Sequence, residues 1–349
     1  MAQSDANTAS IAAVAPSGRR VLVSGGAGFI GSHLVELLLA RGDEVTVVDN
    51  LSTGRRANLP AKHERLRFVE ADLSHALGAL GKGECFEQIY HLAAAVGVKL
   101  VIDDPIRSID VNVEETSQLL RFSVTHGPSG GRSRVLIASS SEVYGKSSHS
   151  PFREEDDVVY GPTSLSRWSY ACAKAIDEYL SLAYSRKKNL GVTVARFFNT
   201  VGPRQIGEYG MVVPRFVAWA LQGKPLEVYG DGSQSRCFCD VRDVSGVLPG
   251  MLETDSTKGG IYNVGSDRPI TIRALAELVI KTLGSSSQIR TVPYAEAYPA
   301  GFEDLQQRRP ALEKLKGAVG FSPRIELEQT IRDVATWMKT SGVGHSHWS

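Results

Sequence analysis

The sequence predicts an α/β fold, a doubly wound parallel sheet with a smaller C-terminal lobe. Three observations predict it. Short β-rich runs alternate with helical patterns over residues 20–198, as expected of parallel strands joined by helices. A glycine-rich turn separates the first strand from the first helix. Beyond Asn199 the alternation ends, and the remaining helices and strands are short and scattered.

The first predicted unit is a strand at Arg20–Ser24, a glycine turn and a helix that ends near Gly42. The turn has the spacing G-x-x-G-x-x-G, which permits close approach of a pyrophosphate to the helix N-terminus. This order predicts a Rossmann-type dinucleotide-binding unit. The expected cofactor contacts in the turn are Gly25, Gly28, Phe29, Ile30 and Gly31.

The second predicted strand, residues 45–48, leads into Asp49, which lies eighteen residues past Gly31. An acid at this place binds the ribose hydroxyls of adenosine, and its charge repels the 2′-phosphate of NADP. The sequence therefore predicts NAD as the cofactor.

Further strands are predicted at 67–70, 88–92, 134–138 and 192–196. Ligands of doubly wound sheets bind at the carboxyl ends of the strands. Six residues that follow predicted strands are therefore expected to share one crevice: Gly25, Asp49, Asp72, Ala93, Ser139 and Asn199.

A helix is predicted over residues 168–188, and it places Tyr170 and Lys174 four residues apart on one face. A free phenol has a pKa near 10, and a nearby ammonium lowers it by favouring the phenolate. A hydroxyl from the serine run 139–141 could share the proton. Such a set can take a proton from a sugar hydroxyl while a hydride leaves the same carbon.

Composition argues against several other partners. The formal net charge is +1, so there is no global field for nucleic acid or an anionic membrane, and no apolar run is long enough to span a bilayer. No metal site is expected. The four cysteines are interpreted as reduced packing residues of a cytoplasmic protein: Cys85, Cys172, Cys237 and Cys239.

Taken together, these runs resemble the extended short-chain dehydrogenases/reductases, specifically the NAD-dependent nucleotide-sugar epimerase/decarboxylase/dehydratase group. The resemblance covers roughly residues 19–338. It rests on the glycine turn and on six further runs: Asp49-Asn50, His91-Leu92-Ala93-Ala94, Ser141-Glu142-Val143-Tyr144-Gly145, the Tyr170/Lys174 pair, residues 198–204 and residues 229–236.

The resemblance implies a role for each matching residue. Tyr170 would be the base, Lys174 would lower its pKa and bind the nicotinamide ribose, and Ser140 would share the substrate proton. Further cofactor contacts would be Asn50, Asp72, Leu73, Leu92, Ala93, Ala94 and Asn112. Substrate contacts would be Ser141, Asn199, Arg215, Tyr229, Arg236 and Arg308, with Asn199, Arg236 and Arg308 at the uracil-diphosphate end. Ala311 departs from the pattern, because many relatives carry Asp there.

Composition and the change of pattern after Asn199 predict a domain organisation, and the resemblance adds an expected dimer. We expect a disordered leader over residues 1–17 and an NAD-binding domain with the Tyr/Lys pair over 18–198. Residues 199–340 would form mainly a nucleotide-sugar-binding lobe interleaved with the first domain, before a frayed tail at 341–349. A homodimer is expected through helices near 110–122 and 170–184.

Glu142 is the position expected to decide the reaction. UDP-glucuronate decarboxylases resemble this chain in the run Ser-Glu-Val-Tyr-Gly, so we expect UDP-glucuronate to be converted to UDP-xylose through a 4-keto intermediate. Glu142 would act on the uronate carboxylate by like charge and order a water. The alternatives are a UDP-glucose or UDP-glucuronate 4-epimerase, a GDP-mannose-type 4,6-dehydratase, and a non-catalytic NAD-sensing relative. Residues 95–99 do not match the loop of xylose-forming decarboxylases.

Overall fold

A computed structural model describes residues 18–81, 83–94, 104–207, 211–293, 296 and 307–341 of the chain. The expected leader, the tail beyond Ser341 and the loop 95–99 lie outside these residues.

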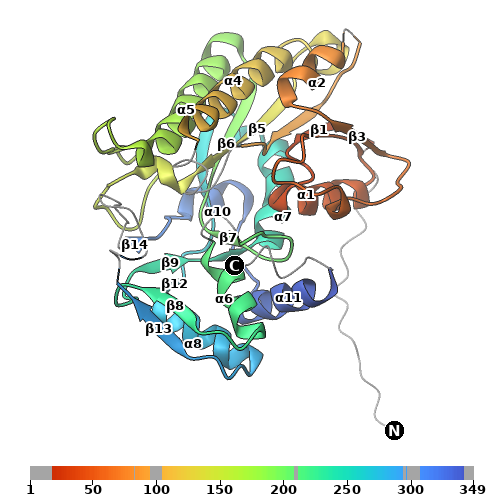
Figure 1. The fold of residues 1–349 in the computed structure, drawn as a ribbon. Helices are drawn as coiled ribbons and strands as arrows, with labels where there is room; N and C mark the ends of the chain where they lie inside the picture. The colour runs from red at the N-terminus through yellow and green to blue at the C-terminus, as the bar shows by residue number, and fades with distance from the viewer. Residues whose placement is uncertain are drawn as a thin grey trace.

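A seven-stranded parallel sheet forms the centre of the molecule (Figure 1), as the sequence predicts. The strand order is β11-β6-β5-β4-β1-β2-β3, so the order reverses between β1 and β4. The strands are β1 (Arg20–Ser24), β2 (Glu44–Asp49), β3 (Leu66–Glu70), β4 (Gln88–His91), β5 (Arg134–Ser140), β6 (Gly191–Phe197) and β11 (Gly260–Val264). Such a reversal is where doubly wound sheets open a crevice for ligands.

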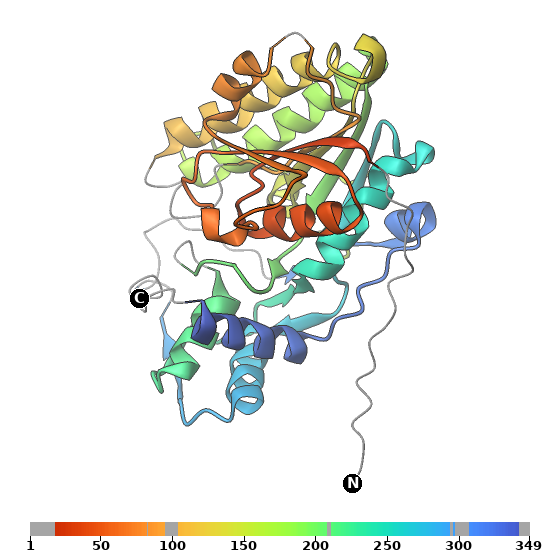
Figure 2. The same cartoon turned by 90° about the vertical axis from the view of Figure 1, so that its right-hand side faces the viewer.

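Helices cover both faces of this sheet (Figure 2). One face carries α2 (Leu73–Ala79), α4 (Pro105–Ser123) and α5 (Ser169–Lys188); the other carries α1 (Phe29–Ala40) and α7 (Val241–Glu253). Strand residues alternate between the two layers. In β1, Val21 and Val23 belong to the core beneath α1 and α7, while Leu22 belongs to the core beneath α2 and α4.

The seventh strand, β11, comes from far along the chain and pairs with β6. It was not among the strands predicted from the sequence. Its last three residues, Tyr262, Asn263 and Val264, are buried, and the short run lacks the regular alternation found earlier in the chain. The main sheet is therefore completed by residues beyond 199.

The smaller lobe contains short strands and helices around a separate core (Figure 1). Its helices are α6 (Val212–Leu221), α8 (Ile272–Leu283) and α11 (Leu327–Thr340), with α10 (Glu313–Val319) nearer the main sheet. Its strands are β8 (Leu226–Tyr229), β9 (Ser235–Cys237), β12 (Pro269–Thr271), β13 (Ile289–Val292) and β14 (Gln307–Arg308); β7 (Thr200–Val201) and β10 (Cys239–Asp240) pair beside them.

Capping residues explain where several helices begin and end. Asp104 accepts a 3.0 Å hydrogen bond from the Arg107 amide at the start of α4, and Pro105 occupies the first turn, where its missing N–H costs nothing. Helix α5 ends at Asn189, which is left-handed with φ 50°. In the described residues no helix has the length and apolar character needed to cross a bilayer.

Candidate active site

The glycine turn between β1 and α1 forms a close-packed cradle. Gly25 has a φ of +72°, and a Cβ there would lie 2.7 Å from the Ala93 amide nitrogen. A Cβ on Gly31 would collide with the Gly25 carbonyl oxygen. Among the described residues no side chain caps the N-terminus of α1, whose N-cap residue is Gly28. Free amides at a helix start are a site for phosphate, so these residues fit the pyrophosphate of a dinucleotide.

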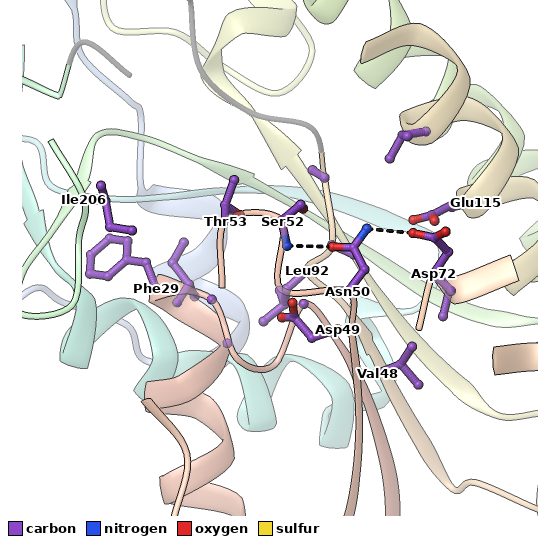
Figure 3. Close-up of a pocket in the computed structure, with 18 of the residues that line it drawn as sticks. Phe29, Val48, Asp49, Asn50, Ser52, Thr53, Asp72, Leu92, Glu115 and Ile206 are labelled. Carbon is purple, nitrogen blue, oxygen red and sulfur yellow. Dashed lines mark hydrogen bonds between the residues drawn. The ribbon is translucent and has the colours of Figure 1, made fainter. Parts of the chain in front are cut away.

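A cavity of about 320 Å³ opens at this turn. Figure 3 shows the side chains around it, which come from the ends of β2, β3 and β4 and from α4. Nearly all cofactor residues expected from the sequence line it: Gly25, Gly28, Phe29, Ile30, Gly31, Asp49, Asn50, Asp72, Leu73, Leu92, Ala93 and Ala94.

Asp49 is held rigidly beside the glycine turn. Its carboxylate accepts hydrogen bonds from the amides of Ala27 (2.9 Å) and Leu51 (2.8 Å). Burial raises its pKa from the ordinary value, and the amide hydrogen bonds oppose that rise. The charge is therefore fixed where it would face the adenosine ribose, which suits NAD and disfavours a 2′-phosphate.

A second acid, Glu115, lies beside Asp72 in the same cavity (Figure 3). Asn50 donates a 2.7 Å hydrogen bond to Asp72. Burial raises the pKa of Glu115 to about 7, and the charges of Asp72 and Glu114 add to the shift. Sequence reasoning missed Glu115. The signal available was its position three residues after Asn112 on the same helix.

Asn112 itself does not line this cavity within the described residues. It is buried in α4, and its side chain donates a 2.6 Å hydrogen bond to the Ser108 carbonyl. Lys174 is likewise buried behind the cavity walls, with 1% of its surface exposed.

A second cavity, of about 400 Å³, adjoins the first. Phe29, Ile30, Leu92 and Ala94 line both cavities. Its walls come from the end of β5, the start of α5 and the smaller lobe. All substrate residues expected from the sequence line it, together with Ser140 and Tyr170: Ser141, Asn199, Arg215, Tyr229, Arg236 and Arg308. Their individual roles stay predictions.

Tyr170 is buried in this cavity, and the Ser140 side chain lines the cavity with it. Burial raises the pKa of the Tyr170 phenol, and the charge of Glu142 adds to that rise, whereas the nearby Ser140 hydroxyl lowers the pKa. The Ser140 hydroxyl also accepts a 3.2 Å hydrogen bond from the Glu142 amide, which caps the 3-10 turn Ser141–Tyr144. The phenol and the hydroxyl are thus placed to exchange a proton.

Glu142 lies between two arginines. Arg167 donates a 2.7 Å hydrogen bond to Oε2, and Arg308 pairs with Oε1. Burial alone would raise the pKa of Glu142, but the two guanidinium groups outweigh it and lower the pKa to about 2. Glu142 is therefore ionised throughout the neutral range. The sequence analysis did not assign Arg167 to the site, although it directly precedes the Trp168-x-Tyr170 run.

Arg308 contacts Glu142 from the smaller lobe. Its strand β14 pairs in parallel with β9, which puts Arg308 next to Arg236 in register. Both arginines were expected at the diphosphate end of the substrate. In the structure both arginines line the second cavity, and the Arg308 guanidinium pairs with Glu142, so their contact with the diphosphate stays a prediction.

The described residues contain no group of three or more His, Cys, Asp or Glu side chains that could hold a metal ion. The fold and the two adjoining cavities define a dinucleotide-dependent enzyme, and Tyr170 is its candidate acid–base group.

Comparison with known proteins agrees with this class. Residues 21–265 match the family model described as the NAD dependent epimerase/dehydratase family. A UDP-N-acetyl-alpha-D-glucosaminuronate decarboxylase of Bacillus cytotoxicus is 39% identical over 330 residues, which cover 92% of this chain and 98% of that one. A UDP-glucuronic acid decarboxylase 1 of Danio rerio is 35% identical over 313 residues, covering 89% and 70%.

Among solved structures, the UDP-glucose 4-epimerase of Thermus thermophilus in complex with NAD is similar with a TM-score of 0.78 and 31% identity, covering 92% of this chain and 99% of that one. The chain belongs to the NAD dependent epimerase/dehydratase family. It is an enzyme, and its cofactor is NAD. The fold class, the family and the cofactor predicted from the sequence are confirmed.

Proposed function

We propose that the protein decarboxylates UDP-glucuronate to UDP-xylose through a 4-keto intermediate. The observation that carries the proposal is the pair of arginines around Glu142 in the cavity that also holds Tyr170. An anion-binding group of this kind beside the acid–base tyrosine suits a sugar that carries its own carboxylate. The family's decarboxylases at 34–39% identity support it.

The chemistry follows from the residues in the cavity. Bound NAD supplies the hydride acceptor and later the hydride donor for C4. Tyr170, as phenolate, takes the C4 hydroxyl proton while Ser140 holds that oxygen. The C4 ketone makes the C6 carboxylate a β-keto carboxylate, so the C5–C6 bond breaks, CO2 leaves and the electron pair enters an enolate. C5 then takes a proton from a water molecule, which re-forms the C4 ketone, and Tyr170 returns its proton to the C4 oxygen as C4 is reduced.

The geometry changes the part expected of Glu142. A lone carboxylate would repel the uronate, but here two guanidinium groups offset its charge, and the three side chains together carry a charge of +1. We therefore propose that Glu142 orients the side chains of Arg167 and Arg308. In this arrangement a guanidinium group faces the substrate carboxylate.

A second candidate substrate is UDP-N-acetylglucosaminuronate. The Bacillus cytotoxicus relative named for that sugar is 39% identical, whereas the UDP-glucuronic acid decarboxylases are 34–36% identical. Both sugars carry the C6 carboxylate that the arginines would bind, and they differ only in the substituent at C2.

The test is to incubate the protein separately with UDP-glucuronate, UDP-N-acetylglucosaminuronate and UDP-glucose. Products are identified by NMR, and released CO2 is measured. CO2 from UDP-glucuronate with formation of UDP-xylose supports the proposal. Interconversion of UDP-glucose and UDP-galactose without CO2 from either uronate would assign the protein to the epimerases instead.

We also propose a homodimer formed through α4 and α5. Large apolar side chains are exposed on these packed helices: Ile106 (73%), Ile109 (41%), Ile176 (48%) and Tyr179 (68%). Exposed apolar side chains clustered in this way favour association with a second copy.

The four cysteines are free thiols, which supports a reducing, cytoplasmic location.

A further inference from the structure

Lys174 has a buried partner on its own helix. Its ammonium donates a 2.8 Å hydrogen bond to Oδ2 of Asp177, three residues further along α5. Asp177 has no exposed surface, and Lys174 has 1%. Water therefore does not screen this pair, and its charges act on neighbouring groups more strongly than surface charges would.

We propose that Asp177 is a positioning residue of the catalytic pair: it holds the Lys174 ammonium and offsets its charge, and so determines how strongly Lys174 acts on the Tyr170 phenol. The proposal rests on the role of Tyr170 as the base in the proposed function. No role in the site was expected of Asp177 from the sequence.

Stability alone does not account for this carboxylate. In the described part of the chain, its other oxygen, Oδ1, is buried without a hydrogen bond that meets normal geometry. A buried ion pair with an incompletely satisfied oxygen contributes little net stability, because desolvation offsets the attraction. Burial raises the pKa of Asp177, and the charge of Lys174 opposes that rise.

The other charged groups around the pair have partners of their own. On β4, His91 bonds Ser24 (2.7 Å) and Thr116 (3.0 Å); burial, together with the charge of Lys174, lowers its pKa to about 3, so it is neutral. On α5, Glu178 pairs with Arg196 of β6 at 2.7 Å.

Two further acids complete the surroundings. Glu142, on the 3-10 turn packed against α5, pairs with Arg167 and Arg308. Glu115 lies on α4 and lines the cofactor cavity. From α4, the uncharged Thr116 faces Asp177. Asp177 is thus the carboxylate in direct contact with the catalytic ammonium.

The direction of the effect follows from the charges. The negative charge of Asp177 raises the pKa of Tyr170, as does that of Glu142. Removing the Asp177 charge leaves the Lys174 ammonium uncompensated, which favours the phenolate. Since Tyr170 must be ionised to accept the substrate proton, activity should then persist to lower pH.

The experiment compares wild type with Asp177→Asn, which keeps the shape and one oxygen acceptor. Asp157→Asn, an exposed loop position, is the control for the same change in net charge. The pH dependence of kcat/KM is measured from NADH formed on adding UDP-sugar under single-turnover conditions. We expect the acid limb to move down by about one pH unit, so that the variant is about tenfold more active relative to wild type at pH values below that limb.

A direct titration separates this proposal from the proposed function. With carbon-13 at Cζ of tyrosine and NAD bound, the Tyr170 resonance, assigned with Tyr170→Phe, should titrate at lower pH in Asp177→Asn, whatever product the enzyme makes. If that variant fails to fold, Asp177→Ser removes the same charge with less volume and is judged by the same shift. A Tyr170 titration that stays in place or moves to higher pH overturns the proposal, and a missing CO2 product overturns only the assigned reaction.

Discussion

Tyr144 donates a 2.7 Å hydrogen bond to Oδ1 of Asn263, and both side chains are completely buried. The bond connects the Ser-Glu-Val-Tyr-Gly run after β5 to strand β11, 119 residues away. Asn263 also donates two hydrogen bonds. Its backbone N–H donates to Oε1 of Glu154 (2.8 Å), and its side-chain Nδ2 donates to the Phe152 carbonyl (3.0 Å). The turn that carries Glu142 is therefore anchored by the far edge of the sheet.

Tyr144→Phe should lower the free energy of unfolding by about 1–3 kcal/mol, because it leaves the buried Asn263 oxygen without its donor. Denaturant unfolding measures the change. Tyr184→Phe is the matched control, since the Tyr184 side chain is only half-buried and should lose much less. Equal losses in the two variants would contradict the role of the Tyr144 bond.

Tyr170→Phe should reduce turnover by about a hundred- to ten-thousand-fold, the usual effect of removing a positioned acid–base group. The affinity for NAD and UDP-sugar should change little, because the phenol acts on the proton in the transition state. Steady-state kinetics and calorimetric titration measure the two effects. If the variant keeps more than about a tenth of wild-type activity, Tyr170 is not the base.

Glu142→Gln should spare NAD binding and the first hydride transfer but slow CO2 release, because a neutral amide no longer orients Arg167 and Arg308. Single-turnover NADH absorbance and CO2 release distinguish the two steps. Equal slowing of both steps would show that Glu142 does not act on decarboxylation in particular.

The ion pairs of Glu142 also predict a pH dependence of stability. The folded-state pKa of about 2 lies below the ordinary 4.5, so this contribution is complete above pH 4.5 and is lost as the pH falls toward 2. The Glu142→Gln variant has no carboxylate to protonate at this position, so its unfolding free energy should fall less between pH 4.5 and 2 than that of wild type. Unfolding free energies measured across this window check it, and identical slopes for the two proteins would count against the pairing.

Asp49→Asn should bring the affinities for NAD and NADP closer by about tenfold or more, since it removes the charge that repels the 2′-phosphate while keeping an acceptor for the Ala27 or Leu51 amide. Fluorescence titration with both cofactors measures the ratio, with Asp157→Asn as the control. Wild-type protein that binds both equally would contradict the assigned role of Asp49.

Tyr179→Glu should dissociate the proposed dimer, because it places a charge on the exposed apolar face of α5. Light scattering at micromolar concentration measures the mass. Val159→Glu is the control, since Val159 is 46% exposed but lies outside α4 and α5. A wild-type monomer under these conditions would disprove the dimer.

The parts of the site that are local in sequence could be predicted from it. The glycine turn, Asp49 and the Tyr170/Lys174 spacing each lie within one unit, so periodicity and turn chemistry are enough. The partners of Glu142 could not be predicted, because Arg308 is 166 residues away and reaches it through strand pairing in the lobe. Asp177 could have been noticed, since an acid three residues after Lys174 lies on the same helical face.

The position of β11 has a consequence for handling the protein. A fragment that ends at residue 198 would retain the cofactor turn and Tyr170. It would lack β11, the strand that covers the edge of β6, and α7, the helix that packs against α1. Its open strand edge would present unpaired backbone groups, a template for aggregation. The chain therefore cannot be truncated directly after the cofactor-binding part without leaving the sheet incomplete. A soluble fragment has to continue at least through residue 264, where β11 ends.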